Sequence, residues 1–432
     1  MTFHLVHLGC KVNAAEMETL SRDLLRCGWA AGPLEGADVA VVNTCTVTQR
    51  ADSKSLYAIR RTAARAKRVF VTGCFSELER EAALSIPGVA AIIPQSEKAN
   101  AAALIRASFG AVEKVHDYPG DEALHEPSPH PWDREATEGS SHARVILKIQ
   151  DGCNAFCAYC RIPHARGLPK SVPSRDLLSR VRELSGSGVT ECVLTGINLG
   201  LWRENGSGLE DLLGWILEAS GPMYIRLSSL EPRSFEKSVS RHFDHPRLVP
   251  HLHFPLQGGS DSLLARMNRR YTTAAYRDFL AAMRERKPDL SVSTDVIVGF
   301  PGETEAEFEE SLAFYAACGF SKVHVFPFSP RPKTAAQAMP GRLDAKLLTA
   351  RGDRLKAAAA RWEEAYLRST VGQVQRFVLE TEPIGGFAEG TTDRYLKGRI
   401  PVASAGGLKR GDSAWVRVPA EGDLFEPVTK GA

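Results

Sequence analysis

The 432-residue sequence contains no apolar run long enough to cross a bilayer. Its first residues enter a strand-like segment directly, without the basic, apolar and small-residue regions of a signal peptide. We therefore expect a cytoplasmic protein with no membrane partner. A strong charge of either sign is also missing, and the net charge of +3 neither indicates nor excludes a nucleic-acid partner. The length itself predicts two or three domains.

The sequence also lacks an even number of cysteines, since it contains nine. An odd number in a long chain without a secretory signal argues against a disulfide framework. The cysteines are more typical of thiolates that are kept free for metal binding or catalysis.

Residues 1–110 alternate short apolar runs with helical stretches. The order strand, helix, strand requires crossover connections and therefore predicts an α/β domain with an open parallel sheet. The strands are expected at His4–Leu8, Val39–Val42 and Val69–Thr72, and the helices at Ala14–Arg26 and Ala51–Ala66.

Residues 111–142 are predicted to be a linker, because Pro, Glu, Asp and His dominate from Tyr118 to Ser141 without apolar periodicity. The histidines of this stretch, with His116 and His142, are possible metal ligands. A solvated loop is the favoured interpretation, because no ligand spacing recurs.

Residues 143–370 repeat a strand–helix pattern six times, which predicts a partial TIM-like (β/α)6 barrel. A Lys/Arg/Ala-rich helix follows at Asp344–Arg368, and residues 371–432 predict a small all-β barrel with strands at Arg376–Glu380, Tyr395–Ile400 and Ser413–Val418. The expected strands of the central barrel are Val145–Ile149, Glu191–Leu194, Tyr224–Leu227, His251–Phe254, Ser293–Val298 and Lys322–Phe326.

Cys153, Cys157 and Cys160, here called the central triplet, lie in the run QDGCNAFCAYC directly after a predicted strand. The Cys-x3-Cys-x2-Cys spacing brings three thiolates close enough to hold three corners of a 4Fe–4S cluster. No fourth cysteine lies nearby, so one iron would stay open to an external molecule. The alternatives are a zinc site with His164 as a further ligand, and three incidental core cysteines. The spacing after a barrel strand favours the cluster.

Cys10, Cys45 and Cys74, here called the N-terminal triplet, each follow an apolar strand, in HLVHLGC, DVAVVNTC and RVFVTGC. The carboxyl ends of parallel strands meet at one edge of a sheet, so these thiols are expected to converge on a second cluster site. Three buried, small hydrophobic residues are an equally good interpretation of this pattern. Cys27, Cys192 and Cys318 lie at a helix end or inside apolar segments, and they are expected to have no ligand role.

With both triplets in view, the chain resembles the radical S-adenosylmethionine (SAM) methylthiotransferases along essentially its full length. The tail resembles the RNA-associated TRAM barrel of that family. The motifs that carry the resemblance are LGCKVN (8–13), NTCTVT (43–48), ADSKS (51–55), TGC (72–74), DGCNAFCAYCRIPHARG (151–167), LSSLEP (227–232), PLQGGSD (255–261), MNRRYT (267–272) and DVIVGFPGET (295–304).

The resemblance implies two 4Fe–4S clusters with different tasks. The central triplet would be catalytic, because its cluster cleaves SAM to a 5′-deoxyadenosyl radical. The N-terminal triplet would hold the auxiliary cluster, whose exposed iron carries the sulfur that is methylated and transferred. The residues expected to contact SAM are Tyr159, Thr195, Gly196, Glu231 and Gln257, and an ordinary loop or capping role is the alternative for each.

Within the family, LGCKVN, ADSKS, RLSSLEP and HVFPFSPRPKT most resemble the branch that acts on N6-threonylcarbamoyladenosine at position 37 of tRNA, next to the anticodon. The implied product carries a methylthio group at C2. The implied partners are the tRNA anticodon stem-loop and an electron donor such as a flavodoxin or ferredoxin. The same chemistry on N6-isopentenyladenosine, or on an aspartate of a ribosomal protein, is the alternative. A non-catalytic iron–sulfur module that binds tRNA is a further one.

Basic residues give the RNA partner partial support of their own, because such side chains position phosphates without reading sequence. A solvated helix face is the alternative. The residues concerned are Lys54, Arg60, Arg61, Arg65, Lys67, Arg68, Arg269 and Arg270.

Overall fold

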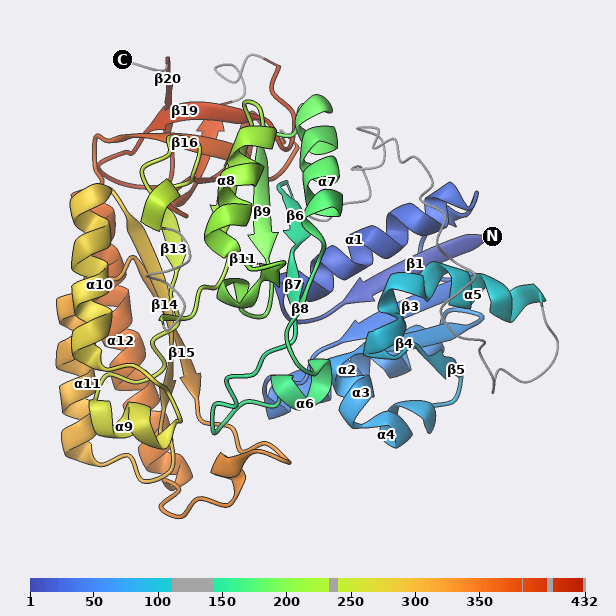
Figure 1. Cartoon of the computed structure of the whole chain (residues 1–432), viewed down its shortest axis with the longest axis horizontal. Helices are drawn as coiled ribbons and strands as arrows, with labels where there is room; N and C mark the ends of the chain where they lie inside the picture. The colour runs from blue at the N-terminus through green and yellow to red at the C-terminus, as the bar shows by residue number, and fades with distance from the viewer. Residues whose placement is uncertain (111–142, 233–239, 383, 402–406, 430–432) are drawn as a thin grey trace. The chain divides into compact units, whose positions relative to one another are not determined.

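The computed structural model of the chain describes residues 1–110, 143–232, 240–382, 384–401 and 407–429 (Figure 1). The linker predicted at 111–142, with its histidines, lies outside the described residues. The described chain forms two compact units. The first holds the residues up to 110 together with His164–Gly167, and the second holds residues 143–163 and those from 168 onward.

The first unit is built on a parallel five-stranded sheet with the order β2-β1-β3-β4-β5. Its central strand β3 is buried along its whole length, and its side chains alternate between the two faces. Val39 and Val41 pack on one face with residues of α1 and α5, and Ala40 and Val42 pack on the other with residues of α2 and α3. The strands are β1 (Thr2–His7), β2 (Ala30–Ala31), β3 (Val39–Thr44), β4 (Val69–Gly73) and β5 (Val89–Ile92).

The helices of this unit are α1 (Lys11–Arg26), α2 (Gln49–Ala63), α3 (Cys74–Leu78), α4 (Arg80–Leu84), the 3-10 helix η1 (Gln95–Asn100) and α5 (Ala101–Gly110). The sequence predicted both long helices, α1 and α2, but placed the first residue of each too far along the chain. The side chain of Thr48 accepts a hydrogen bond from the Ala51 backbone and so starts α2 at Gln49. The sequence also missed β2 and β5, which are short.

Six parallel strands form the barrel part of the second unit, as predicted. They occur as the groups β12-β9-β6 and β13-β14-β15. Parallel bridges between Ile225 and Leu248 and between Ser229 and His253 join the two groups. The strands are β6 (Val145–Lys148), β9 (Glu191–Thr195), β12 (Tyr224–Leu227), β13 (His251–His253), β14 (Ser291–Val298) and β15 (Lys322–Pro327).

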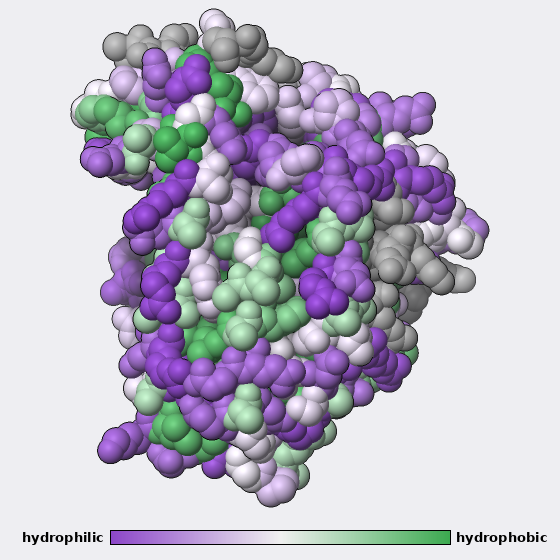
Figure 2. All heavy atoms as spheres, turned by 90° about the vertical axis from the view of Figure 1, so that its left-hand side faces the viewer, coloured by the Kyte–Doolittle hydropathy of each residue, from purple (hydrophilic) through white to green (hydrophobic). Residues whose placement is uncertain are grey.

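Helices cover the outer face of these strands, where one large hydrophobic cluster forms the core. They are α7 (Ser174–Gly186), α8 (Leu209–Ala219), α10 (Thr273–Arg286), α11 (Glu305–Cys318) and α12 (Ala345–Ser369). The short helix α9 (Asp261–Arg266) packs in a separate, smaller cluster with Met267 and Phe300. Hydrophilic side chains predominate on the face shown in Figure 2, with smaller hydrophobic areas among them. No described helix is long and apolar enough to span a membrane.

The C-terminal part of the second unit is an antiparallel sheet with the order β18-β17-β16-β19-β20, which confirms the predicted all-β tail. The sequence missed β17 and β20, which contain Gly, Glu and Pro, residues that are depleted in strands. The strands are β16 (Val374–Leu379), β17 (Phe387–Thr392), β18 (Lys397–Pro401), β19 (Ser413–Arg417) and β20 (Glu426–Val428).

A buried carboxylate joins this sheet to the barrel strands. Glu191 of β9 accepts from Nε of Arg226 at 2.6 Å, lies 2.9 Å from Nε of Arg144, and pairs with Arg376 of β16. Burial alone would raise the pKa of Glu191, but the three guanidinium groups hold it well below its ordinary value. The carboxylate is therefore charged in the folded protein.

Candidate cluster sites

The N-terminal triplet follows three neighbouring strands of one parallel sheet. Cys10 comes after β1, Cys45 after β3 and Cys74 after β4. The structure therefore brings the three thiols to the carboxyl edge, as the sequence predicted. Cys45 and Cys74 are buried, and Cys10 is exposed. Cys45 also lines a hollow of about 440 Å³, whose other lining residues are His7, Leu8, Gly9, Thr48, Arg50, Ala51 and Lys54.

Hydroxyl and carboxylate side chains of α2 fix the loop that carries Cys45. Ser55 accepts from the backbone N–H of Cys45 at 3.1 Å and donates to its carbonyl at 2.8 Å. Thr46 donates to Asp52 at 2.6 Å. These bonds explain why the motifs NTCTVT and ADSKS occur together, because the second motif holds the first in place.

Two glycines allow the strand ends to come together. Gly9 has φ +92°, and a Cβ atom added to it would lie 2.6 Å from the Cys45 sulfur. Gly73 has φ +103°, and a Cβ atom there would overlap the backbone of Thr44. The glycines of LGC and TGC are therefore required by both backbone conformation and space.

Arg166 is a functional residue that sequence reasoning missed. Its Nε lies 3.2 Å from the sulfur of Cys74, and its other nitrogens donate to Glu16 at 2.9 Å and to Asn13 at 2.5 Å. Lys98 also donates to Glu16, at 2.5 Å. The only available signal was its place in the motif DGCNAFCAYCRIPHARG, which does not reveal a contact with a cysteine 92 positions earlier.

Burial governs the protonation of these groups. It raises the pKa of the Cys74 thiol, and the nearby Arg166 guanidinium partly offsets the effect. It also raises the pKa of Cys45 to about 11 and lowers that of Lys98. Iron binds thiolates, so loading this site would displace protons that burial otherwise keeps in place.

The central triplet lies in the loop after the short strand β7 (Gln150–Asp151). Two hydrogen bonds shape this loop: the backbone N–H of Ala158 donates to the carbonyl of Met267, and the side-chain Nδ2 of Asn268 donates to the carbonyl of Phe156, at 2.9 Å each. Phe156 has φ +47°, a left-handed conformation that turns the chain between the first two cysteines. Burial raises the pKa of Cys160 to about 12 and that of Cys153 as well.

Arg269 contacts the central triplet in the second unit. It lies 3.4 Å from the sulfur of Cys157, 2.8 Å from a carboxylate oxygen of Glu231 and 2.9 Å from the carbonyl of Pro255. The expectation that Arg269 adds charge for RNA is wrong, because its side chain is 2% exposed and is fully engaged by these partners. Arg270 is exposed, as expected.

The other predicted SAM contacts occupy different surroundings. Tyr159 meets Phe300 edge to face, with ring centroids 6.5 Å apart. Thr195 is buried at the end of β9, and Gly196 packs so closely on Gln150 that a Cβ atom would lie 3.0 Å from it. Gln257 has φ +72° and exchanges backbone hydrogen bonds with β14. These roles stay predictions.

The spacing of the sulfur atoms argues against zinc. In the part of the chain that the structure describes, the one group of three Cys, His, Asp or Glu ligand atoms within 4.8 Å of one another contains no cysteine. A zinc ion bound at about 2.3 Å would draw its thiolates to roughly 3.8 Å from one another. A cluster presents a separate iron to each thiolate and therefore accepts a wider triplet. His164, the suggested zinc ligand, is exposed and belongs to the first unit.

The remaining three cysteines lie at the kinds of position that the sequence indicated. Cys192 and Cys318 are buried in the hydrophobic core of the second unit. Cys27 is half-buried at the end of α1, where Nη1 of Arg106 lies 3.4 Å from its sulfur.

The basic run near α2 divides into two parts. Arg65 pairs with Glu35 at 3.1 Å, Lys67 pairs with Asp38 at 2.7 Å, and Arg68 donates to a backbone carbonyl. By contrast, the positions 50, 54, 57 and 61 lie on one helix face and present Arg, Lys, Tyr and Arg to solvent. The Tyr57 side chain in their midst is 68% exposed.

Comparison with known proteins matches two stretches of the chain to known families. Residues 147–315 match the family described as the Radical SAM superfamily, and residues 2–94 match the one described as Uncharacterized protein family UPF0004. The chain is 33% identical to the Threonylcarbamoyladenosine tRNA methylthiotransferase MtaB of Thermotoga maritima, over 92% of this chain and 90% of that protein.

The chain belongs to the radical SAM methylthiotransferase family. It is also 30% identical to the tRNA-2-methylthio-N(6)-dimethylallyladenosine synthase of Sphingopyxis alaskensis, over 98% of this chain and 96% of that protein. A solved radical SAM methyltransferase, TsrM from Kitasatospora setae, shares the fold with a TM-score of 0.58 at 14% identity, over 78% of this chain and 76% of that one.

Family membership confirms the predicted fold class and implies that the enzyme uses SAM and two 4Fe–4S clusters. The donor sets fit both clusters. Each triplet offers three thiols and one arginine that donates to a sulfur, at Cys74 in the first unit and at Cys157 in the second. Three thiols leave one iron of a cubane without a protein ligand.

Proposed function

We propose that this methylthiotransferase adds a methylthio group to C2 of N6-threonylcarbamoyladenosine at position 37 of tRNA. The observation that carries the proposal is the pair of thiol triplets, one behind a parallel sheet edge and one behind a barrel strand, in a chain that resembles MtaB over 92% of its length. Relatives named for dimethylallyladenosine are 30–33% identical, so that nucleoside is the second candidate.

The central triplet would hold the cluster that cleaves SAM. When bound, this cluster and SAM supply a 5′-deoxyadenosyl radical, which can attack an unreactive C–H bond. Arg269 donates to the sulfur of Cys157 and holds the carboxylate of Glu231 in place through an ion pair. Glu231 is thereby held as an acceptor, which suits the α-amino group of SAM.

The N-terminal triplet would hold the auxiliary cluster, which supplies the sulfur when bound. Arg166 donates to Cys74, and Ser55 holds the backbone of Cys45 from both sides. The hollow beside Cys45 leaves room for a ligand next to this site. Cys10, the exposed member, lies where a transferred group can leave.

The tRNA partner rests on the family and on the exposed face of α2. Arg50, Lys54 and Arg61 offer positive charge for phosphates, and Tyr57 offers a ring on which a base can stack. Arg50 and Lys54 also line the hollow beside Cys45. An electron donor of the flavodoxin or ferredoxin class and a cytoplasmic location remain predictions.

The test compares Cys157→Ala and Cys45→Ala in reconstituted enzyme under anaerobic conditions with reductant, SAM and tRNA. Cys157→Ala should give neither 5′-deoxyadenosine nor product. Cys45→Ala should still cleave SAM but transfer no sulfur. Full methylthiolation by both variants would refute the division of roles.

A second measurement settles the nucleoside. Enzyme is incubated with tRNA that carries either threonylcarbamoyladenosine or isopentenyladenosine, and the nucleosides are analysed by mass spectrometry. A 2-methylthio product only from the first tRNA supports the proposal. A product only from the second assigns the enzyme to the other branch.

A further inference from the structure

Three polar side chains, those of His253, Asp295 and His324, lie together on the inner face of β13, β14 and β15. His253 pairs in register with Ser293, and Asp295 pairs with His324. Parallel neighbours in register point to the same face, so all four side chains share it. On the opposite face, Val292 and Val296 belong to the hydrophobic core that the helices cover.

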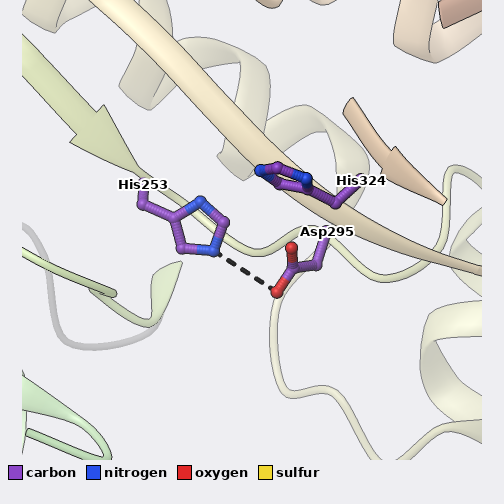
Figure 3. Close-up of side chains that lie close together, drawn as sticks. All are labelled: His253, Asp295 and His324. Carbon is purple, nitrogen blue, oxygen red and sulfur yellow. Dashed lines mark hydrogen bonds and ion pairs between the residues drawn. The ribbon is translucent and has the colours of Figure 1, made fainter. Parts of the chain in front are cut away.

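Figure 3 shows the two imidazoles and the carboxylate turned toward one another. Nε2 of His253 lies 3.3 Å from a carboxylate oxygen of Asp295, and the two imidazole centroids are 5.9 Å apart. One ligand atom from each of His253, Asp295 and His324 lies within 4.8 Å of the other two. An ion held at about 2.1 Å needs ligand atoms roughly 3–4 Å apart, so small side-chain rotations complete the site.

A hydroxyl group behind the cluster orients one of the histidines. Ser293 Oγ lies 2.9 Å from Nδ1 of His253 and 3.1 Å from Nε2 of His251. A serine hydroxyl donates one hydrogen bond and can accept others, so it can accept from His253 while it donates to His251. In that arrangement Nε2 of His253 turns a lone pair toward the Asp295 carboxylate, and a cation bound between them would remove the repulsion.

This arrangement is the one that metal-binding histidines use, in which the second ring nitrogen is tied to an outer partner. His324 is exposed and His253 and Asp295 are partly exposed, so an ion can reach all three from solvent.

We propose that His253, Asp295 and His324 bind a divalent metal ion that is separate from the iron–sulfur clusters. Two imidazoles and one carboxylate suit Mn²⁺, Fe²⁺, Co²⁺ or Zn²⁺, and they leave coordination positions open on the inner face of the strands. This proposal does not depend on which nucleoside of tRNA the enzyme modifies. An ordinary hydrogen bond from His253 to Asp295 is the competing arrangement, in which Ser293 donates to Nδ1 instead.

The experiment uses reconstituted holoenzyme with its clusters in the oxidised, diamagnetic state, so that Mn²⁺ is the only paramagnet. Titration with Mn²⁺ is followed by electron paramagnetic resonance, in which the signal of the free ion reports binding. The wild type should take up one tight equivalent. Asp295→Asn and His324→Gln should each lose it, and Ser293→Ala should weaken it about tenfold, as outer partners of metal ligands do.

His245→Gln is the matched control, because this histidine lies in the same unit but outside the cluster. It should bind Mn²⁺ as the wild type does. Iron content and circular dichroism show whether each variant is folded. If a variant does not fold, the wild-type titration still tests whether the protein binds one tight equivalent of Mn²⁺. Absence of a tight equivalent in the wild type, or its persistence in Asp295→Asn, would overturn the proposal.

Discussion

Arg166 should raise the reduction potential of the cluster held by the N-terminal triplet. Its side chain is fully buried, and its Nε lies 3.2 Å from the sulfur of Cys74. A reduced cluster carries one more negative charge than an oxidised one, so a buried cation at hydrogen-bond distance stabilises the reduced state more. Arg166→Gln removes that charge, and the potential should fall.

The magnitude follows from the strength of one charge-assisted hydrogen bond. Such a bond contributes about 1.5–3 kcal/mol. If about 1.4 kcal/mol of it differs between the two redox states, the one-electron potential falls by about 59 mV. Arg166→Lys keeps the positive charge but loses the guanidinium nitrogens that also donate to Glu16 and Asn13. We therefore expect the reduction potential to fall by less than in Arg166→Gln.

The assay is a potentiometric titration followed by electron paramagnetic resonance. It is performed in a background in which all three cysteines of the central triplet are alanine, so that only one cluster contributes. Arg269→Gln in the same background is the control, because it removes a buried arginine of the second unit rather than the one that contacts Cys74. Lys98 still pairs with Glu16 in the Arg166 variant, which keeps that carboxylate satisfied. An unchanged potential with the cluster intact would refute the reasoning.

Three other experiments test the structure at separate points. Ser55→Ala should cost about 1–3 kcal/mol of unfolding free energy in urea and loosen Cys45, whereas the exposed Ser53→Ala should cost little. Glu191→Gln should cost about 3–5 kcal/mol at pH 7. Because its folded pKa is lowered, the wild-type advantage is present above the ordinary pKa and disappears as pH falls below it, and a pH series of urea titrations checks this. Lys54→Ala with Arg61→Ala should reduce the salt slope of tRNA binding by roughly two, and an unchanged slope would exclude α2 from the contact.

The sequence predicted the parts of the fold in which periodicity and burial coincide. All six barrel strands emerged from apolar patterns, and the long helix α12 emerged from its Lys/Arg/Ala-rich composition. The strands β2, β5, β17 and β20 did not emerge. β2, β5 and β20 have two to four residues, too few to show a period, and β17 does not alternate apolar with polar residues. Tertiary pairing rather than local preference makes them strands.

The candidate site was predictable where position in the fold follows from strand order. Three strand-end cysteines converge in any parallel sheet with neighbouring strands, and the N-terminal triplet does so. The arginines were not predictable in the same way. Arg166 reaches Cys74 across 92 positions and Arg269 reaches Cys157 across 112, and only tertiary structure shows that both are buried donors rather than surface charges.

The central claim is that each triplet holds its own 4Fe–4S cluster, and iron analysis of anaerobically purified protein tests it most directly. The wild type should contain about eight irons and eight sulfides per chain, and replacing either triplet with alanine should leave about four of each. Four irons in the wild type, or an alanine variant that keeps all eight, would contradict the account.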